Sequence, residues 1–169
     1  MPCVAIVLFA GCSDPHATAR SLLTDPNPEI RREAIRTLSS DANSARTYLP
    51  EFTAALRDSD SSIRVAAALA IQRFDPQNAA HQPILESALR AGQGPVFLEV
   101  GRAGRDAAWA VPTLLTLLDD RRPPIRALAA QTLGAIAPAE EHVRAALQRS
   151  LRDENAAVRN ASRRALHPE

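Results

Sequence analysis

A pattern that recurs along the chain constrains its fold more than any other feature of the sequence. It reads Leu-x-Asp, four spacer residues, Ile or Val followed by Arg, and a small residue three positions later. Copies begin at Leu23, Leu56, Leu118 and Leu151, so the aspartates stand at positions 25, 58, 120 and 153. A recurrence every ~31 to 33 residues, with the longest gap counted as two units, is typical of a stacked repeat protein.

The amino-acid composition favours helices over a sheet. Aromatic residues make up 4% of the 169 residues, whereas alanine and leucine are abundant. Sheets are enriched in aromatic and β-branched residues, and helices in alanine and leucine. We therefore expect an all-α fold.

Hydrophobic periodicity and helix-boundary residues divide positions 15 to 166 into five helical pairs. Prolines mark several helix starts, because proline is tolerated in the first turn and not beyond it. Asp60 or Ser61 is the expected N-cap of the second helix in the second pair. The expected first and second helices are, pair by pair, 17–23 and 29–38, 45–57 and 61–74, 77–90 and 95–102, 106–118 and 123–136, 140–152 and 155–166.

The third pair departs from the pattern. Ala91 stands where the aspartate recurs and Phe97 where the arginine recurs, and glycines crowd positions 92 to 104. Glycine inside a helix costs up to ~1 kcal/mol relative to alanine. We expect the segment 91–105 to be the weakest unit of the array and a hinge.

The stretch GRAGRDAAWAVPTLLTLLDDRRPPIRALAAQTLGAIAP, residues 101–138, resembles a HEAT repeat of the short bacterial form related to phycobilin-lyase-like repeats. The Val-Pro pair in the first helix, the turn aspartate and the Ile-Arg pair carry the resemblance. It implies an armadillo-like α-solenoid, a right-handed superhelix of about five two-helix repeats, which would make 13–169 a HEAT-repeat domain.

The recurring aspartates and arginines are interpreted as structural. A turn aspartate can accept backbone N–H bonds from the start of the next helix, and a guanidinium can fork to a carboxylate in its own or a neighbouring turn. In HEAT families, residues of this kind form a ladder along the stack. The corresponding ladder here consists of Asp25 with Arg31, Asp58 with Arg64, Asp120 with Arg126, and Asp153 with Arg159.

The first twelve residues, MPCVAIVLFAGC, form an apolar segment that is too short to span a bilayer. Residues Phe9 to Cys12 resemble the cleavage box of bacterial lipoproteins, in which the cysteine is lipidated. That resemblance implies a membrane-anchored lipoprotein of the cell envelope, with Ser13 favouring the outer membrane. The alternative is a terminal strand or helix packed on the first repeat of a cytoplasmic protein.

No catalytic, cofactor-binding or metal-binding constellation is visible. Adjacent carboxylates such as Asp119 and Asp120 point apart on a helix, the cysteines match no zinc spacing, and there is no phosphate-binding glycine loop. A net charge of +1 provides no overall field that attracts nucleic acid. The four histidines, His16, His81, His142 and His167, are interpreted as surface or loop residues.

The exposed face of the second helices is the best candidate binding surface, because it lines the concave side of such solenoids. An apolar middle flanked by arginines could hold a peptide or a partner helix. The alternative is that Val65 and Leu69 pack against a neighbouring helix, and Trp109 is expected in the core. The candidate partner-binding residues are Arg32, Arg36, Val65, Leu69, Leu128, Gln131 and Arg164.

The sequence therefore predicts a non-enzymatic protein-interaction scaffold, tethered to a membrane if Cys12 is modified. A cytosolic bilin-lyase-like or lyase-accessory protein is the second hypothesis, which the repeat resemblance permits. A DNA-associated HEAT protein is the third, suggested by the arginines of the last pair.

Overall fold

The computed structural model describes residues 15–167, so the predicted lipidation site Cys12 and its neighbour Ser13 lie outside the described residues. The described part is built from helices and turns, which confirms the expected all-α fold. The α-helices are α1 (Pro15–Ser21), α2 (Pro28–Leu38), α3 (Ala42–Thr47), α4 (Leu49–Ala55), α5 (Ser61–Phe74), α6 (Gln82–Ala91), α7 (Gly94–Ala103), α8 (Val111–Leu117), α9 (Pro123–Ile136), α10 (Glu141–Ser150) and α11 (Ala156–Leu166). Short 3-10 helices are η1 (Leu22–Thr24), η2 (Ala79–His81) and η3 (Gly104–Ala110).

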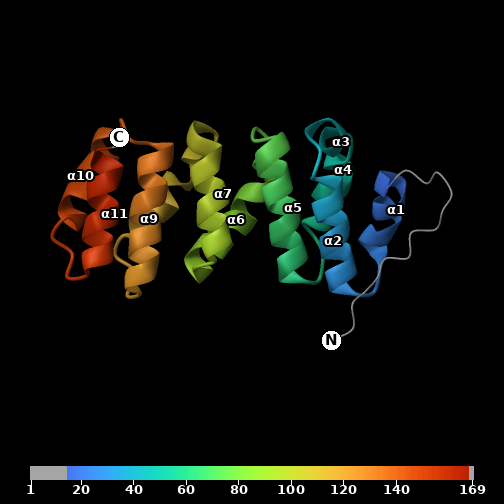
Figure 1. Cartoon of the computed structure of the whole chain (residues 1–169), viewed down its shortest axis with the longest axis horizontal. Helices are drawn as coiled ribbons and strands as arrows, with labels where there is room; N and C mark the ends of the chain where they lie inside the picture. Colours follow the sequence, from blue (N-terminus) through green and yellow to red (C-terminus); the bar gives the residue numbers. More distant parts are fainter. Residues whose placement is uncertain (1–14, 168–169) are drawn as a thin grey trace.

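The helices stack in one elongated row. Figure 1 shows the second helices of the five pairs, α2, α5, α7, α9 and α11, standing side by side along the long axis. The first helices of the pairs pack against this row and make up the other layer. This two-layer arrangement is the α-solenoid that the repeat pattern predicts.

The second helices follow the sequence expectation closely, because their ends are set by local side chains. Both α5 and α9 have the predicted bounds. Asp60 is the N-cap of α5, and its side chain accepts a hydrogen bond from the Ser62 N–H at 2.7 Å. Asn27 and Asn155 cap α2 and α11 in the same way. Such caps satisfy backbone donors that the first turn leaves free.

Three of the first helices are interrupted rather than continuous. The expected helix 45–57 is divided into α3 and α4, and the expected helices 77–90 and 106–118 open with the 3-10 helices η2 and η3. Pro50, Pro83 and Pro112 lie in the first turns of α4, α6 and α8. Since a proline farther inside an α-helix would lose a hydrogen bond and clash with the preceding turn, each proline starts a new helix.

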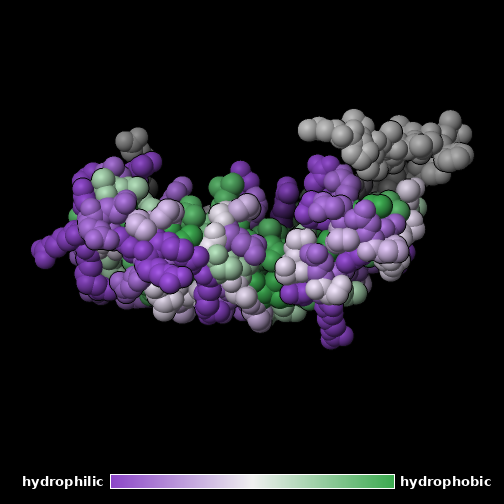
Figure 2. Space-filling model, turned by 90° about the horizontal axis from the view of Figure 1, so that it is seen from below, coloured by the Kyte–Doolittle hydropathy of each residue, from purple (hydrophilic) through white to green (hydrophobic). Residues whose placement is uncertain are grey.

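The core lies between the two layers and consists of two clusters that meet at α5. Ala67 and Ile71 of α5 belong to the N-terminal cluster, whereas Ala68 belongs to the larger C-terminal cluster with Phe97 and Leu133. The predicted packing stripes Ile63–Ala67–Ile71 and Ile125–Ala129–Leu133 are buried. On the face seen in Figure 2, the C-terminal end of the array is mostly hydrophilic, and apolar patches lie nearer the middle.

Gly134 allows α9 and α11 to approach closely. A Cβ atom built on Gly134 would lie 2.4 Å from the Cβ and 2.7 Å from the Cα of Ala165. No side chain fits at these distances, so the contact of the last two repeats depends on the missing side chain.

Candidate functional site

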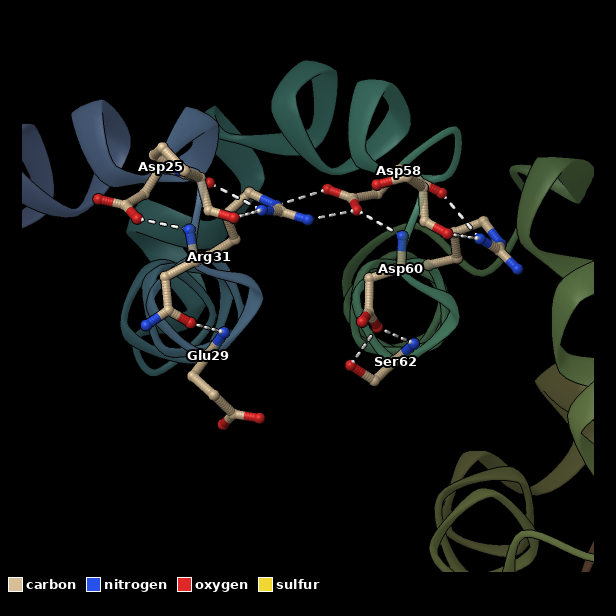
Figure 3. Close-up of polar contacts among 10 residues, drawn as sticks. Asp25, Glu29, Arg31, Asp58, Asp60 and Ser62 are labelled. Carbon is tan, nitrogen blue, oxygen red and sulfur yellow. Dashed lines mark hydrogen bonds and ion pairs between the residues drawn. The ribbon is translucent and has the colours of Figure 1, made fainter.

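Arginine–aspartate pairs in the turns hold successive second helices in register. Arg31, in the first turns of α2, donates two hydrogen bonds to the Asp58 carboxylate, from Nε at 2.8 Å and from Nη2 at 2.7 Å. Its Nη1 donates to the carbonyl of Asp25 in its own turn at 2.7 Å (Figure 3). One guanidinium therefore joins the turns of two consecutive pairs.

The turn aspartates also order their own loops. The Asp58 carboxylate accepts the Asp60 N–H at 2.8 Å, so it holds the N-cap residue of α5 in place (Figure 3). The hydrogen bonds from Arg31 are the main reason that the pKa of the Asp58 carboxyl lies below its ordinary value. Asp153 accepts the same two hydrogen bonds from Nε and Nη2 of Arg126, and they lower the pKa of the Asp153 carboxyl.

The ladder is interrupted at the third pair, where the sequence predicted a departure. Arg64 donates from Nη1 to the carbonyls of Asp58 and Ser59, at 2.8 and 2.9 Å, as Arg31 does in its own turn. Because Ala91 occupies the aspartate position of the next turn, no carboxylate among the described residues accepts a hydrogen bond from the Arg64 guanidinium. Phe97, at the arginine position, is buried in the core.

Asp120 accepts hydrogen bonds from an arginine of its own turn instead. Arg122 donates from Nε and Nη2 to the two carboxylate oxygens, both at 2.9 Å, and its backbone N–H donates at 2.8 Å. These bonds lower the pKa of Asp120 to about 2. Arg122 Nη2 also donates to the carbonyl of Arg90 at 3.0 Å, which ties this turn to the third pair. The ladder thus resumes with a different arginine.

With the second helices held in this order, their exposed faces form one groove, which we call the second-helix groove. It consists of four hollows that share lining residues. Leu69, Arg73 and Glu99 line both the hollow over α2 and α5 and the hollow between α5 and α7. Arg102 continues the groove to the hollow between α7 and α9, and Gln131 to the hollow between α9 and α11. The groove therefore runs along all five pairs.

Comparison with known families agrees with this geometry. A sequence model described as HEAT repeats matches residues 17–100, and a second, described as HEAT repeat, matches residues 110–139. Together they cover more than half of the chain. The chain belongs to the HEAT-repeat family.

The solved structures support the same fold for the HEAT-repeat chain. It is similar to the crystal structure of an engineered protein, with a TM-score of 0.60 and 19% sequence identity over 90% of this chain and 78% of the other. At this identity the likeness shows the fold alone. No curated protein matches the chain.

The second-helix groove contains most of the predicted partner-binding residues. Val65 is the exception, because it packs partly buried against the larger core cluster, which is the alternative expected from the sequence. Leu69 does both, since it lines the groove and packs against that cluster. The predicted residues that line the groove are Arg32, Arg36, Leu69, Leu128, Gln131 and Arg164.

Sequence reasoning missed the groove residues of α7. Leu98 is 52% exposed, and it is the one exposed large apolar side chain within the part of the chain that the structure describes. It lies beside Leu128 in the hollow between α7 and α9. The ladder pattern fails in this pair, so the exposed face of α7 could not be assigned by alignment with the other repeats.

The interpretation of His81 as a surface or loop residue is wrong. Its side chain is fully buried, with Nε2 2.6 Å from Gln72 Oε1, and its ring meets the Trp109 ring edge-on at a centroid distance of 5.6 Å. Trp109 Nε1–H donates to the same Gln72 oxygen at 2.8 Å. Burial lowers the pKa of His81 below its ordinary value, more than Asn78 and Asp75 raise it. His142 and His167 are exposed, as predicted.

The described residues show no arrangement for metal chemistry or for crossing a membrane. No group of three or more His, Cys, Asp or Glu side chains among them is placed to hold a metal ion. Within the same residues, no helix is both long and apolar enough to span a bilayer.

Proposed function

We propose that the chain is a protein-interaction scaffold that holds a segment of a partner polypeptide in the second-helix groove. The observation that carries this proposal is the continuity of the groove across all five pairs, with exposed Leu98 near its middle. An exposed leucine in a concave surface loses contact with water when a partner covers it, which stabilises the complex.

Site-specific photo-crosslinking tests this proposal in the native host. A benzophenone amino acid replaces Gln131 in the groove or, as a matched control, Arg144, which is exposed on α10 outside the groove. We expect a defined partner to crosslink at position 131 and not at position 144. Leu98→Ser should weaken that crosslink and lower the melting temperature by at most a few degrees, because Leu98 is already 52% exposed. Equal crosslinking at both positions would contradict a groove-bound partner.

We further propose that Cys12 anchors the scaffold to a bacterial membrane. The support is the sequence Phe9-Ala10-Gly11-Cys12, with Ser13 favouring the outer membrane. Acyl labelling and membrane fractionation of the wild type and Cys12→Ser in a bacterial host test the anchor. A labelled, membrane-bound wild type with a released mutant is the expected result. An unlabelled wild type would leave the cytosolic lyase-like and DNA-associated hypotheses to be tested instead.

A further inference from the structure

The hollow between α5 and α7, which we call the central cleft, lies where the core clusters meet and the ladder is interrupted. It has a volume of about 530 Å³, which is within the range of ligand-binding sites. Leu69 and Ala103 give it apolar walls, and its charged lining residues are Arg73, Arg102, Glu99 and Asp106. Gln72, which is 3% exposed, also lines it.

The amide nitrogen of Gln72 is a buried donor without an acceptor. The Trp109 indole N–H can only donate, so the amide oxygen of Gln72 must face it, and His81 Nε2 contacts the same oxygen. The Nε2 atom consequently lies on the other side of the amide. It is buried and has no hydrogen-bond partner within the described residues. Leaving such a donor unpaired costs ~1–3 kcal/mol.

The charges around the central cleft favour an anionic acceptor. Arg102 donates to Glu99 at 2.7 Å, so these two side chains largely neutralise each other. Arg73 lies over the Phe74 ring and forms no ion pair with any described residue. Asp106 is an opposing charge on the rim, and it is exposed. A carboxylate can accept from Gln72 and Arg73 together, whereas a neutral carbonyl would gain less from the guanidinium.

We infer that the central cleft binds an acidic side chain of the partner, whose carboxylate accepts hydrogen bonds from Gln72 Nε2 and Arg73. This inference rests on the proposed function, since it names the chemistry of one part of the segment held in the second-helix groove. Arg73 and Arg102 are exposed and have long side chains. They can therefore change conformation to let the carboxylate enter and can contact it once it is bound. Among the residues that line the groove, arginines outnumber acidic residues, which favours an acidic segment.

Nuclear magnetic resonance of the isotope-labelled full chain tests the inference with a defined probe, acetyl-tetraglutamate amide. Its matched control is acetyl-tetraglutamine amide. We expect the tetraglutamate peptide to shift the Gln72 side-chain amide and the Trp109 indole N–H saturably, with at least tenfold weaker binding of the tetraglutamine peptide. The sole tryptophan makes the indole signal unambiguous.

Two variants test which residues carry the binding. Gln72→Glu keeps the oxygen that Trp109 needs and replaces the donor, so it should weaken tetraglutamate binding at least tenfold. Unchanged backbone amide signals in α2 and α11, which are remote from position 72, would show that the fold is kept. Arg73→Gln should weaken binding severalfold without touching the core, and Arg144→Gln on α10 should leave it unchanged.

Several results would overturn the inference. These are equal binding of the two peptides, tetraglutamate binding that leaves the Gln72 and Trp109 signals unmoved, an unweakened Gln72→Glu variant, or no binding at all. Each of these leaves the proposed function standing if the partner still crosslinks at position 131. Loss of that crosslink specificity would instead contradict the groove itself.

Discussion

Arg126 and Asp153 join two consecutive repeats through parallel hydrogen bonds, from Nε at 2.8 Å and from Nη2 at 2.9 Å. Both side chains are nearly buried, with 9% and 12% of their surface exposed. The Arg31–Asp58 pair repeats this arrangement near the other end of the array. Bidentate pairs of this kind are directional, so they fix how one turn sits against the next.

Removing one partner of this pair should destabilise the protein. Arg126→Gln leaves Asp153 nearly buried without its cation, and we expect the melting temperature to fall by about 4–10 °C. Arg32→Gln removes an exposed pair with Glu29 and should change it by less than ~1 °C. The double variant Arg126→Gln, Asp153→Asn should lose less than the sum of the two single changes. Equal small effects of Arg126→Gln and Arg32→Gln would refute the structural role.

The ladder aspartates should make the protein acid-sensitive. Their hydrogen bonds to arginine lower the pKa of Asp58 and Asp153 in the folded state below the ordinary 3.8, and lower that of Asp120 to about 2. The stabilisation is therefore complete above pH ~4 and is lost as the pH falls toward 2. Thermal unfolding should show this decline, with a shallower slope for Asp153→Asn. An identical slope in the variant would show that this carboxyl does not titrate with unfolding.

Buried His81 should produce a second decline at higher pH. Burial lowers its folded pKa below the ordinary 6.5, so the unfolded chain takes up a proton first as the pH falls. Stability contributed by the neutral ring should therefore begin to fall below pH ~6.5. The pKa of His81, followed by nuclear magnetic resonance, should lie below the ordinary 6.5. A higher pKa at His81 would mean that the flanking oxygens outweigh burial.

Glycine at position 134 should be required, unlike glycine at position 101. Gly134→Ala would force α11 away from α9, because the new Cβ meets the backbone of Ala165, and we expect a loss of ~1–3 kcal/mol or more. A Cβ at Gly101 would meet Ala135 and Thr132 at ordinary distances of 3.8 and 4.0 Å. Gly101→Ala in α7 should thus stabilise by up to ~1 kcal/mol. Denaturant unfolding of both variants provides the comparison, and similar effects would contradict the close approach.

Amide hydrogen exchange should be fastest within residues 91–105. This pair lacks the turn aspartate and the arginine of the other pairs, and the core divides at α5 beside it. Its link to the next turn is made by the hydrogen bonds from Arg122 to the carbonyls of Arg90 and Ala91. Regions with fewer stabilising contacts open more often. The helix α9 serves as the internal reference. Protection across 91–105 as uniform and slow as in α9 would remove the hinge hypothesis.

Local chemistry made the second helices predictable. The caps Asn27, Asp60 and Asn155 and the prolines of the first turns fix helix ends from within a few residues, so α5 and α9 have the predicted bounds. The ladder residues could be recognised because they recur at the repeat interval. What the recurrence could not indicate is which turn an arginine reaches. Arg31 bonds the carboxylate of the next turn and the backbone of its own.

Features that depend on stacking were not predictable. His81 is buried because Gln72 and Trp109, from other pairs, close around it. No local periodicity marks a histidine for burial in this way. Leu98 and the central cleft belong to the pair where the repeat pattern is lost, and their exposure follows from how α5, α7 and α9 are spaced.

The location of the bound partner tests most directly whether the second-helix groove is the binding surface. Once crosslinking has supplied a partner, methyl cross-saturation from the protonated partner to the deuterated, methyl-labelled scaffold will identify the covered face. We predict transfer to the groove methyls of Leu69, Leu98 and Leu128. Transfer to Leu115 and Leu151 on the other layer, with the groove methyls unaffected, would contradict the claim that the second-helix groove holds the partner.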